Sequence, residues 1–368
     1  MDDVKHHLYA LIFCGGGGTR LWPFSKDARP KQFLKIDGKK SLLRQTYERI
    51  VPLIPPERIF LVTVAGYGDE IDEEIPEIPK AQVLIEPARR NTAMAAGLGA
   101  VAIAKKDPLA VIANIWSDPY IGNDSIYRKA LLAGAKAAFD GKNLVTTGVP
   151  PKYPHTGLGY VKKERIHDVI EDVEVYKVEK FIEKPKLDEA KRMVISGNYL
   201  WHVGLLIWRV DAFMEGLKEH SHDTFERLER IAQWFGKPGG KDKVIKEYLA
   251  APDMSIDVAL AEKATNFLVV EGKYDWRDLG DFSVLWDVGE KDKDGNHVHL
   301  DTGGDWTGID TKESIIISEG HRMVATIGLT DMIVVATENA TLVAPKSQAQ
   351  KVKKIVERLK EEKKKEFL

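Results

Sequence analysis

The residues whose types could handle phosphate groups lie near the start of the chain, directly after a short apolar run. Residues 14–25 read CGGGGTRLWPFS, and PKQF follows at 30–33. Glycines have no Cβ, so their N–H groups can point at an oxyanion and phosphate oxygens can approach the main chain closely. Arg20 and Lys31 follow at fixed places and could neutralise phosphate charge. The segment therefore predicts a phosphate-binding turn, although a glycine cluster alone is more often a flexible loop.

Two common phosphate motifs do not describe this turn. The glycines are not closed by Gly-Lys-Ser/Thr, so the turn is not a P-loop. Neither Gly15-x-Gly17 nor Gly16-x-Gly18 has a third glycine at the offset of a dinucleotide fingerprint. The ordinary kinase and dehydrogenase interpretations are therefore excluded.

The turn must be positioned by the alternating elements that the first two-thirds of the chain predict. Apolar runs predict buried strands at 8–13, 59–64, 82–85, 110–115 and 144–147, with a later strand at 203–210. Helical spacing predicts helices at 41–53, 92–105, 125–139, 188–196, 223–235 and 255–264. This alternation favours an α/β fold with a mainly parallel sheet and helices on both sides. Phosphate sites recur after the first strand of such sheets, which argues against a merely flexible loop.

The composition changes near residue 289. Residues 290–296 are charged and contain glycine, as in a linker, and short β runs follow at 314–318, 323–327, 332–336 and 341–344. The last helix is expected to bury one apolar stripe, made of Val352, Ile355, Val356 and Leu359. The Lys/Glu-rich tail beyond it is expected to be a solvated, fraying end. We therefore expect two domains, at 1–288 and 289–368.

The bulk composition excludes several classes of protein. The chain has 368 residues, 43% of them hydrophobic, and a formal net charge of -2, which is neither the basic footprint of a nucleic-acid binder nor the signature of a disordered chain. Its one cysteine, Cys14, cannot form an internal disulfide and suits a reducing compartment. The sequence has neither a secretory pattern nor ~18 uncharged apolar residues in a row. We expect a cytoplasmic protein with no membrane and no nucleic-acid partner.

The glycine-rich segment with PKQF resembles the signature of bacterial mannose-1-phosphate guanylyltransferases, within the sugar-nucleotide pyrophosphorylase family. Four further segments match in the same order: EPARRNTA at 86–93, SD at 117–118, FIEKP at 181–185, and SID at 255–257 followed by WRDLG at 276–280. The likeness spans roughly residues 8–345. Each motif is moderately specific alone, and five in order are strong support.

The resemblance implies a Rossmann-like nucleotidyltransferase domain with a mainly parallel mixed sheet. A small left-handed β-helix-like C-terminal domain and a terminal helix would follow, in agreement with the boundary near 289. Relatives also form homodimers. Bifunctional relatives carry an isomerase domain beyond this point, but the sequence has no cluster of metal-spaced histidines, so we expect no isomerase activity.

The activity implied by the resemblance joins GTP to a sugar 1-phosphate, with mannose 1-phosphate the first candidate and Mg²⁺ as the cofactor. GDP-sugar and pyrophosphate are the products. A phosphate dianion is already nucleophilic near neutral pH, so no general base is required. Catalysis should be mostly positioning and electrostatic stabilisation of repelling phosphates.

The resemblance also implies the site residues. The catalytic residues would be Arg20, Lys31, Asp118 and Asp278, the two aspartates being the Mg²⁺ ligands. The nucleotide-binding residues would be Gly15, Gly16, Gly18, Thr19, Glu86, Pro87, Asn91, Thr92, Ala93 and Ser117. The sugar-phosphate-binding residues would be Gly159, Glu183, Lys184 and His202. Without the resemblance, the aspartates would be turn or cap residues, the cations solvated surface charges, and the Asn-Thr pair a helix cap.

The sequence departs from the family pattern mainly in the sugar region. Relatives have His where Pro119 follows the metal-binding aspartate. HTGLGY at 155–160 replaces ETGYGY, and LWHVGL at 200–205 replaces LWNSGM, so His155, Leu158, His202 and Val203 differ. Changed hydrogen-bonding groups alter hydroxyl preference. Another sugar 1-phosphate, such as a heptose or modified mannose, therefore stays open.

A second alternative is a non-catalytic, GDP-sugar-binding regulatory paralogue. Its signature would be a broken metal or pyrophosphate site. Gly15, Arg20, Lys31, Asp118 and Asp278 are all present, which favours the enzyme.

Overall fold

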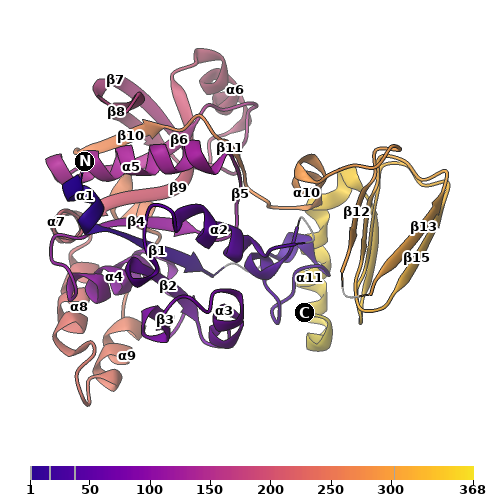
Figure 1. The fold of residues 1–368 in the computed structure, drawn as a ribbon, viewed down its shortest axis with the longest axis horizontal. Helices are drawn as coiled ribbons and strands as arrows, with labels where there is room; N and C mark the ends of the chain where they lie inside the picture. The colour runs from indigo at the N-terminus through magenta and orange to yellow at the C-terminus, as the bar shows by residue number, and fades with distance from the viewer. Residues whose placement is uncertain (1, 16–17, 37–38, 302) are drawn as a thin grey trace. The chain divides into compact units, whose positions relative to one another are not determined.

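The computed structural model describes residues 2–15, 18–36, 39–301 and 303–368, and the chain forms two compact units (Figure 1). Unit 1 comprises Met1–Gly15, Glu48–Trp116 and Ile121–Trp276. Unit 2 comprises Gly16–Tyr47, Ser117–Tyr120 and Arg277–Leu368. The expected C-terminal domain from 289 therefore lies in a unit that also takes in the segment following the first strand.

Unit 1 is built on a nine-stranded sheet in the order β3-β2-β1-β4-β9-β6-β10-β8-β7. The strands are β1 Leu8–Cys14, β2 Ile59–Val64, β3 Val83–Glu86, β4 Val111–Trp116, β6 Leu144–Val149, β7 Tyr160–Ile170, β8 Val173–Ile182, β9 Tyr199–Arg209 and β10 Phe267–Glu271. Strands β3, β2, β1 and β4 are parallel, and β10 is parallel to β6. Strand β9 runs antiparallel between β4 and β6. The sheet is thus mixed, and its parallel part carries the glycine-rich turn after β1.

Helices cover both faces of this sheet, as the alternating pattern predicts. They are α1 Asp2–His7, α3 Gly68–Glu74, α4 Asn91–Ala104, α5 Asp124–Gly141, α6 Leu187–Ser196, α7 Val210–His220, α8 His222–Trp234 and α9 Lys241–Leu249, and α2 Leu42–Ile50 crosses the unit boundary. Tyr9, Leu11 and Phe13 of β1 pack in one core cluster with α4 and α8. Alternate side chains of a strand face opposite sides, and the intervening β1 residues are equally buried.

Two elements of unit 1 differ from expectation. Strands β7 and β8 form a hairpin that the sequence pattern missed, because much of β7 is exposed and charged instead of apolar. Its turn residues Glu171 and Asp172 both have left-handed φ angles, as tight hairpin turns require. The helix expected at 255–264 is wrong in length and type, since only Asp257–Ala261 forms a π-helical turn. Just before this turn, Ser255 Oγ accepts the Val258 N–H at 3.3 Å.

Unit 2 contains stacked, parallel strands like the coils of a β-helix. Strands β12 His297–Leu300, β14 Ile315–Ser318 and β16 Met332–Ala336 form a parallel sheet, to which β17 Thr341–Pro345 adds antiparallel to β16. Strand β13 Asp305–Ile309 pairs in parallel with β15 Met323–Ile327. Successive coils are offset by 18 residues, so Asn296 Oδ1 accepts the N–H of Ser314 and Ser314 Oγ accepts that of Met332. The predicted β module is confirmed, and the sequence pattern missed β12 and β13. Short strands β5 Tyr120–Gly122 and β11 Asp275–Arg277 pair with each other.

The core of unit 2 joins segments that are far apart in the sequence. It includes Leu21, Trp22, Phe24, Leu34 and Ile36 from the segment after β1, Phe282 from α10 (Phe282–Val288), Ile315 and Ile333 from the stacked strands, and Val352 and Val356 from α11 (Val352–Glu361). The predicted stripe on α11 is right for Val352, Val356 and Leu359 but wrong for Ile355, which is 39% exposed.

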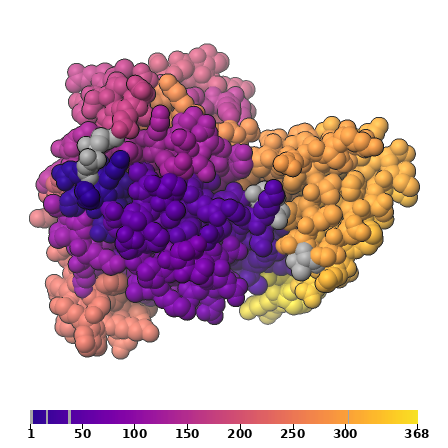
Figure 2. Space-filling view, viewed as in Figure 1, coloured from indigo at the N-terminus to yellow at the C-terminus, as the bar shows by residue number. Residues whose placement is uncertain are grey.

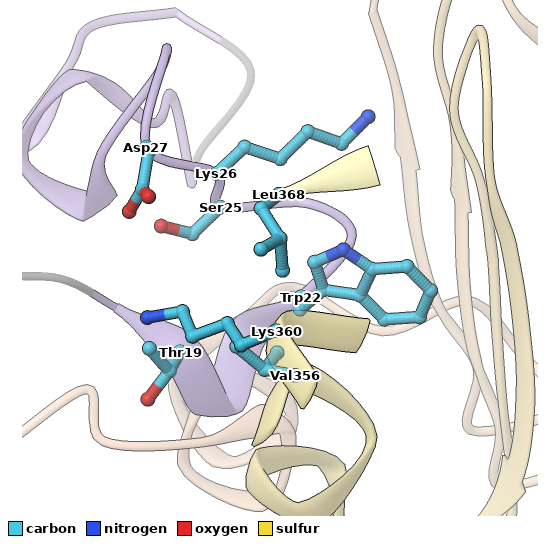
Figure 3. Close-up of a pocket in the computed structure, with 8 residues that line it drawn as sticks. All are labelled: Thr19, Trp22, Ser25, Lys26, Asp27, Val356, Lys360 and Leu368. Atoms are coloured by element: carbon cyan, nitrogen blue, oxygen red, sulfur yellow. The ribbon is translucent and has the colours of Figure 1, made fainter. Parts of the chain in front are cut away.

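The tail after α11 is folded, contrary to the expectation of a fraying end. Residues Lys365–Phe367 form a short helical turn, and the Phe367 carbonyl accepts the indole N–H of Trp22 at 2.6 Å. Leu368 lines a small hollow beside Trp22 and Ser25 (Figure 3). Phe367 and Leu368 pack against the unit 2 core, and the charge-rich composition of the tail gave no indication of this packing.

Candidate functional site

Lys31 brings the two predicted metal-binding aspartates together within unit 2. Its Nζ lies 3.0 Å from Asp118 Oδ2 and 3.4 Å from Asp278 Oδ1. Lys31 begins the short turn Lys31–Phe33, Asp118 follows β4, and Asp278 follows β11. Three segments distant in the sequence therefore meet at one ammonium group.

The charges of this group stabilise one another. Burial opposes the charge of Lys31, but Asp118 and Asp278 outweigh it and raise the pKa of the Lys31 ammonium. The lysine side chain is 6% exposed, whereas the carboxylates are 35% and 42% exposed. The lysine is thus a fixed, permanently charged cation, and the carboxylates keep accessible oxygens.

Gly18 packs against the Cβ of Lys31, at the opposite end of the lysine side chain from the two aspartates. Its φ is 50° and its ψ is 22°, a left-handed conformation that glycine adopts readily. A Cβ at this position would overlap Ser25 Oγ and lie 3.0 Å from Lys31 Cβ. The glycine-rich turn is therefore packed directly against the buried lysine.

Arg20, the second predicted cation, is held by a residue that the sequence analysis did not identify. Its Nη1 donates to Gln350 Oε1 at 3.2 Å, and the Gln350 amide donates to Asp281 Oδ2. Asp281 is 4% exposed and caps α10 through the N–H of Ser283. Gln350 thus connects the arginine of the glycine-rich turn to the helix that follows Asp278, and no motif at residue 350 could have indicated it.

A cavity of about 160 Å³ in unit 1 gathers several of the predicted nucleotide-binding residues. It is lined by Phe13, Cys14, Gly15, Val62, Val64, Glu86, Arg89, Asn91, Thr92, Ala95 and Trp116. Gly15, Glu86, Asn91 and Thr92 were predicted. Arg89 and Trp116 were not, although Arg89 belongs to the EPARRNTA motif and the motif could have indicated it.

The carboxylate of Glu86 lines this cavity and accepts a hydrogen bond from a residue outside the motifs. Tyr248 donates its hydroxyl to Glu86 Oε2 at 2.5 Å. Burial raises the pKa of Glu86, and the bond from Tyr248 and the charge of Arg89 oppose this only in part. Tyr248 lies 162 residues away in sequence and carries no motif signal.

The other predicted nucleotide-binding residues have varied positions. Pro87 follows β3 next to the cavity but does not line it, and Ala93 is buried with its N–H bonded to the Met254 carbonyl at 3.2 Å. Thr19 lines the hollow of Figure 3, and Ser117 is buried in unit 2. Gly16 lies outside the described residues.

The four predicted sugar-phosphate residues lie together in unit 1. The Gly159 carbonyl accepts the N–H of His202 at 2.8 Å, and a Cβ on Gly159 would lie 2.7 Å from Glu183 Oε2. Lys184 pairs with Glu183 at 2.8 Å. The absence of a side chain at Gly159 therefore lets the glutamate approach the strand that carries His202.

Both ring nitrogens of His202 face polar groups, one through a hydrogen bond and one through an ion-pair contact. Thr146 Oγ1 lies 2.8 Å from Nδ1, and Asp257 Oδ1 lies 3.3 Å from Nε2. Burial opposes the charge of Asp257, but His202 and then Lys184 lower the pKa of this carboxyl. The sequence analysis did not name Asp257 as a site residue, although it belongs to the SID motif at 255–257.

A separate group in unit 2 has the composition of a cation site. Ligand atoms of His299, Asp301 and Glu319 all lie within 4.8 Å of one another. The guanidinium of Arg29 pairs with Glu319 at 2.7 Å and with Asp301 at 3.2 Å. Arg29 therefore already supplies positive charge to both carboxylates.

Among the described residues, the helices are too short or too polar to cross a membrane.

Comparison with known proteins identifies the family. Residues 9–295 match the family described as Nucleotidyl transferase, and residues 295–359 match a MannoseP isomerase/GMP-like beta-helix domain. The chain is 32% identical to the mannose-1-phosphate guanylyltransferase of Escherichia coli K12, over 97% of this chain and 74% of that protein. It is 33% identical to the protein of the same name from Salmonella muenchen, over 96% of this chain and 73% of that protein.

A solved structure supports the same relationship. It is named mannose-1-phosphate geranyltransferase, from Thermus thermophilus, and superposes with a TM-score of 0.84 at 32% identity, covering 96% of this chain and 99% of that one. The two family models together match residues 9–359, which include both the nucleotidyl transferase domain and the β-helix domain. The chain therefore belongs to the nucleotidyl transferase family, in its mannose-1-phosphate guanylyltransferase group.

Proposed function

We propose that the chain transfers a guanylyl group from GTP to a sugar 1-phosphate, with α-D-mannose 1-phosphate as the substrate, forming GDP-mannose and pyrophosphate. The observation that carries this proposal is the contact of Lys31 with both Asp118 and Asp278, at 3.0 and 3.4 Å. The names of the relatives support the choice of GTP and mannose 1-phosphate.

The reaction is a displacement at the α-phosphorus of GTP. A sugar-phosphate oxygen forms the new P–O bond, the bond to the β-phosphate oxygen breaks, and pyrophosphate leaves with the electron pair. The chief obstacle is repulsion between two polyanions. Lys31 and Arg20 would neutralise the triphosphate and the departing pyrophosphate, while Lys184 would hold the sugar phosphate.

The carboxylates of Asp118 and Asp278 fit a Mg²⁺ ion. Hard oxygen ligands from one or two carboxylates, with phosphate oxygens and water, are the usual set for this ion. Both carboxylates are partly exposed and face one cation already, so oxygens remain for a second. When bound there, Mg²⁺ supplies positive charge to phosphate oxygens. The group around Glu319 fits less well, because its carboxylates are less accessible: Asp301 is 23% and Glu319 13% exposed, against 35% and 42% for Asp118 and Asp278.

Substitution of the aspartates tests the proposal. We expect Asp118→Asn and Asp278→Asn each to lower turnover at least ~100-fold, about 2.7 kcal/mol, in a pyrophosphate-release assay with GTP and mannose 1-phosphate. Asp331→Asn is the matched control, because Asp331 also pairs with a lysine, Lys346, at 3.0 Å. Near-normal rates for both variants at saturating Mg²⁺ would refute the metal assignment.

The same assay separates the enzyme from a non-catalytic binding protein. Release of pyrophosphate that depends on both substrates supports the enzyme. Tight binding of GDP-mannose without any pyrophosphate release would instead establish a regulatory protein.

The sugar is the part of the proposal with a specific competitor. His202 occupies the place of the family's Asn and is anchored by Thr146 and Asp257, so the hydrogen-bonding groups offered to a sugar differ. A panel of hexose and heptose 1-phosphates with GTP decides between them. Preference for mannose 1-phosphate retains the proposal, and a clear preference for another 1-phosphate replaces it.

We also propose that two copies of the chain associate through the strands β13 and β15 of unit 2, which belong to the orange surface in Figure 2. Ile309, Met323 and Ile327 on these strands are 61%, 61% and 74% exposed. Clustered exposed apolar side chains are typical of interaction surfaces. Light scattering should give twice the chain mass, and Ile327→Asp should give the monomer; an unchanged mass for this variant argues against the face.

We infer a cytoplasmic location from two observations. GTP as substrate requires a compartment that contains it, and the one cysteine, Cys14, is buried in β1 and suits reducing conditions.

A further inference from the structure

Tyr248 contacts the carboxylate of Glu86, one of the predicted nucleotide-binding residues, from outside every motif. It lies in the last turn of α9 and is completely buried. Its hydroxyl donates to Glu86 Oε2 at 2.5 Å. Glu86 ends β3 and lines the cavity that also contains Gly15. The phenol thus reaches this cavity only through the carboxylate that it contacts.

The backbone around Tyr248 is fastened to the same motif at three further points. Arg90 Nε donates to the Leu249 carbonyl at 3.0 Å. The Thr92 hydroxyl accepts the N–H of Ile256 at 2.8 Å, and the Ala93 N–H donates to the Met254 carbonyl at 3.2 Å. These bonds hold the end of α9 and the segment after it against the motif that begins with Glu86, and so keep the phenol within reach of the carboxylate.

The hydrogen bond also favours the ionised form of the carboxyl. Burial raises the pKa of Glu86, while Tyr248 and Arg89 lower it. Burial and the negative charge of Glu86 raise the pKa of the Tyr248 phenol, so it remains a donor. A carboxylate has about four lone-pair sites, so Glu86 keeps acceptor capacity on both oxygens for a ligand.

We propose that Tyr248 is a positioning residue that holds Glu86 as an anionic acceptor for the N1–H and 2-amino groups of guanine, and thereby selects GTP over ATP. The proposal rests on the proposed function of this cavity. Guanine presents two adjacent donors to a carboxylate. Adenine presents the N1 lone pair at the corresponding place, which an anionic oxygen repels. A site built around a fixed polar group discriminates strongly against a ligand that leaves the group unpaired.

The direct test is Tyr248→Phe, which removes one oxygen atom and keeps the ring. We expect the ratio of kcat/KM for GTP over ATP to fall at least ~10-fold, about 1.4 kcal/mol. Inosine triphosphate, which lacks the 2-amino group, should lie between GTP and ATP for the wild type. The matched control is Tyr274→Phe, because Tyr274 is also buried and bonds Thr147 through its hydroxyl at 3.1 Å. This control should leave the ratio unchanged.

The pH profile gives a readout that a merely structural role would not move. Protonation of Glu86 removes acceptor sites, so kcat/KM for GTP should fall as the pH falls through the raised pKa of Glu86. Without the phenol, only Arg89 still favours the anion. The acid limb of the Tyr248→Phe profile should therefore move to higher pH, and that of Tyr274→Phe should not.

Glu86→Gln and the double variant complete a thermodynamic cycle. Glu86→Gln should abolish most of the preference for GTP, and adding Tyr248→Phe should then change the ratio little, since the tyrosine acts through the glutamate. Retained selectivity in Glu86→Gln overturns the proposal whether or not Tyr248→Phe folds, because the tyrosine is proposed to act only through the glutamate.

Calorimetric binding of GTP and ATP separates this inference from the proposed function. A wild type that binds GTP over ATP through Tyr248, yet releases no pyrophosphate with any sugar phosphate, supports the inference and refutes the proposed function. A wild type that turns over GTP with unchanged selectivity in Tyr248→Phe, in binding and in catalysis, overturns the inference alone.

Discussion

Substitution of Gly18 by alanine tests whether the glycine-rich turn is packed to hold Lys31. Gly18 has a φ of 50°, and an L-residue in this left-handed region costs about 1–2 kcal/mol. The new Cβ would also overlap Ser25 Oγ and approach Lys31 Cβ to 3.0 Å. Rotation of the serine cannot relieve both contacts, and overpacking of this kind adds about 1–3 kcal/mol. We therefore expect a loss of about 2–5 kcal/mol of stability for the sum of the two effects.

Gly18→Ala should also affect activity, because the new Cβ can be accommodated only if Lys31 moves. Lys31 is held between Asp118 and Asp278, so a shift of its backbone moves the ammonium relative to both carboxylates. A misplacement on the order of 1 Å can cost about 100-fold in rate. We expect kcat to fall by about this factor, with a smaller change in KM for the sugar phosphate.

Gly15→Ala is the matched control in the same turn. A Cβ on Gly15 meets nothing within 4 Å, so the midpoint of urea unfolding should not change. Its KM for GTP should rise, because the methyl group obstructs the approach of a phosphate to the main chain. Urea unfolding and pyrophosphate release are measured for both variants. The reasoning is refuted if Gly18→Ala unfolds at the wild-type urea concentration and keeps wild-type turnover.

Two further predictions concern contacts outside the motifs. Gln350→Ala should lower kcat about 3–10-fold, the value of one hydrogen bond, because Arg20 of the glycine-rich turn loses its partner. Gln348→Ala, in the same short helix, should leave kcat unchanged. Equal rates for both variants would contradict this prediction. The Arg209 guanidinium, with help from Lys142, lowers the pKa of Asp211 to about 2. The ion pair of Arg209 with Asp211 therefore stabilises the fold at pH values above the ordinary carboxyl pKa, and this stabilisation is lost as the pH falls toward 2. Urea unfolding should therefore show Asp211→Asn destabilised at pH 7 and close to wild type near pH 2, and a pH-independent difference would oppose this account.

Local signals sufficed for the elements nearest the glycine-rich turn. Strand β1 is an unbroken apolar run that is buried on both faces, so its place in the sheet could be inferred from composition. The turn after it has two cations at short spacing, and Asp118 comes directly after another buried strand. The spacing locates these residues, whereas their expected roles came from the family resemblance.

Other parts could not be predicted because their partners are distant in sequence. Tyr248 in a helix has the pattern of an ordinary core residue until its contact with Glu86 is seen. Ile355 belongs to an apolar stripe wider than the face that α11 buries. The charged strand β7 is stabilised by pairing with β8 and β9. The spacing of apolar residues in the sequence does not indicate such pairing.

The bond between Trp22 and Phe367 has a consequence for synthesis of the protein on the ribosome. The two residues are 345 positions apart, and the apolar side chains after β1 pack against strands made equally late. At about 5–20 residues per second, Trp22 would wait roughly 17–70 s for its acceptor. During this interval the apolar side chains after β1 lack their partners on the stacked strands, so chaperone capture of nascent chains should be strongest before these strands emerge.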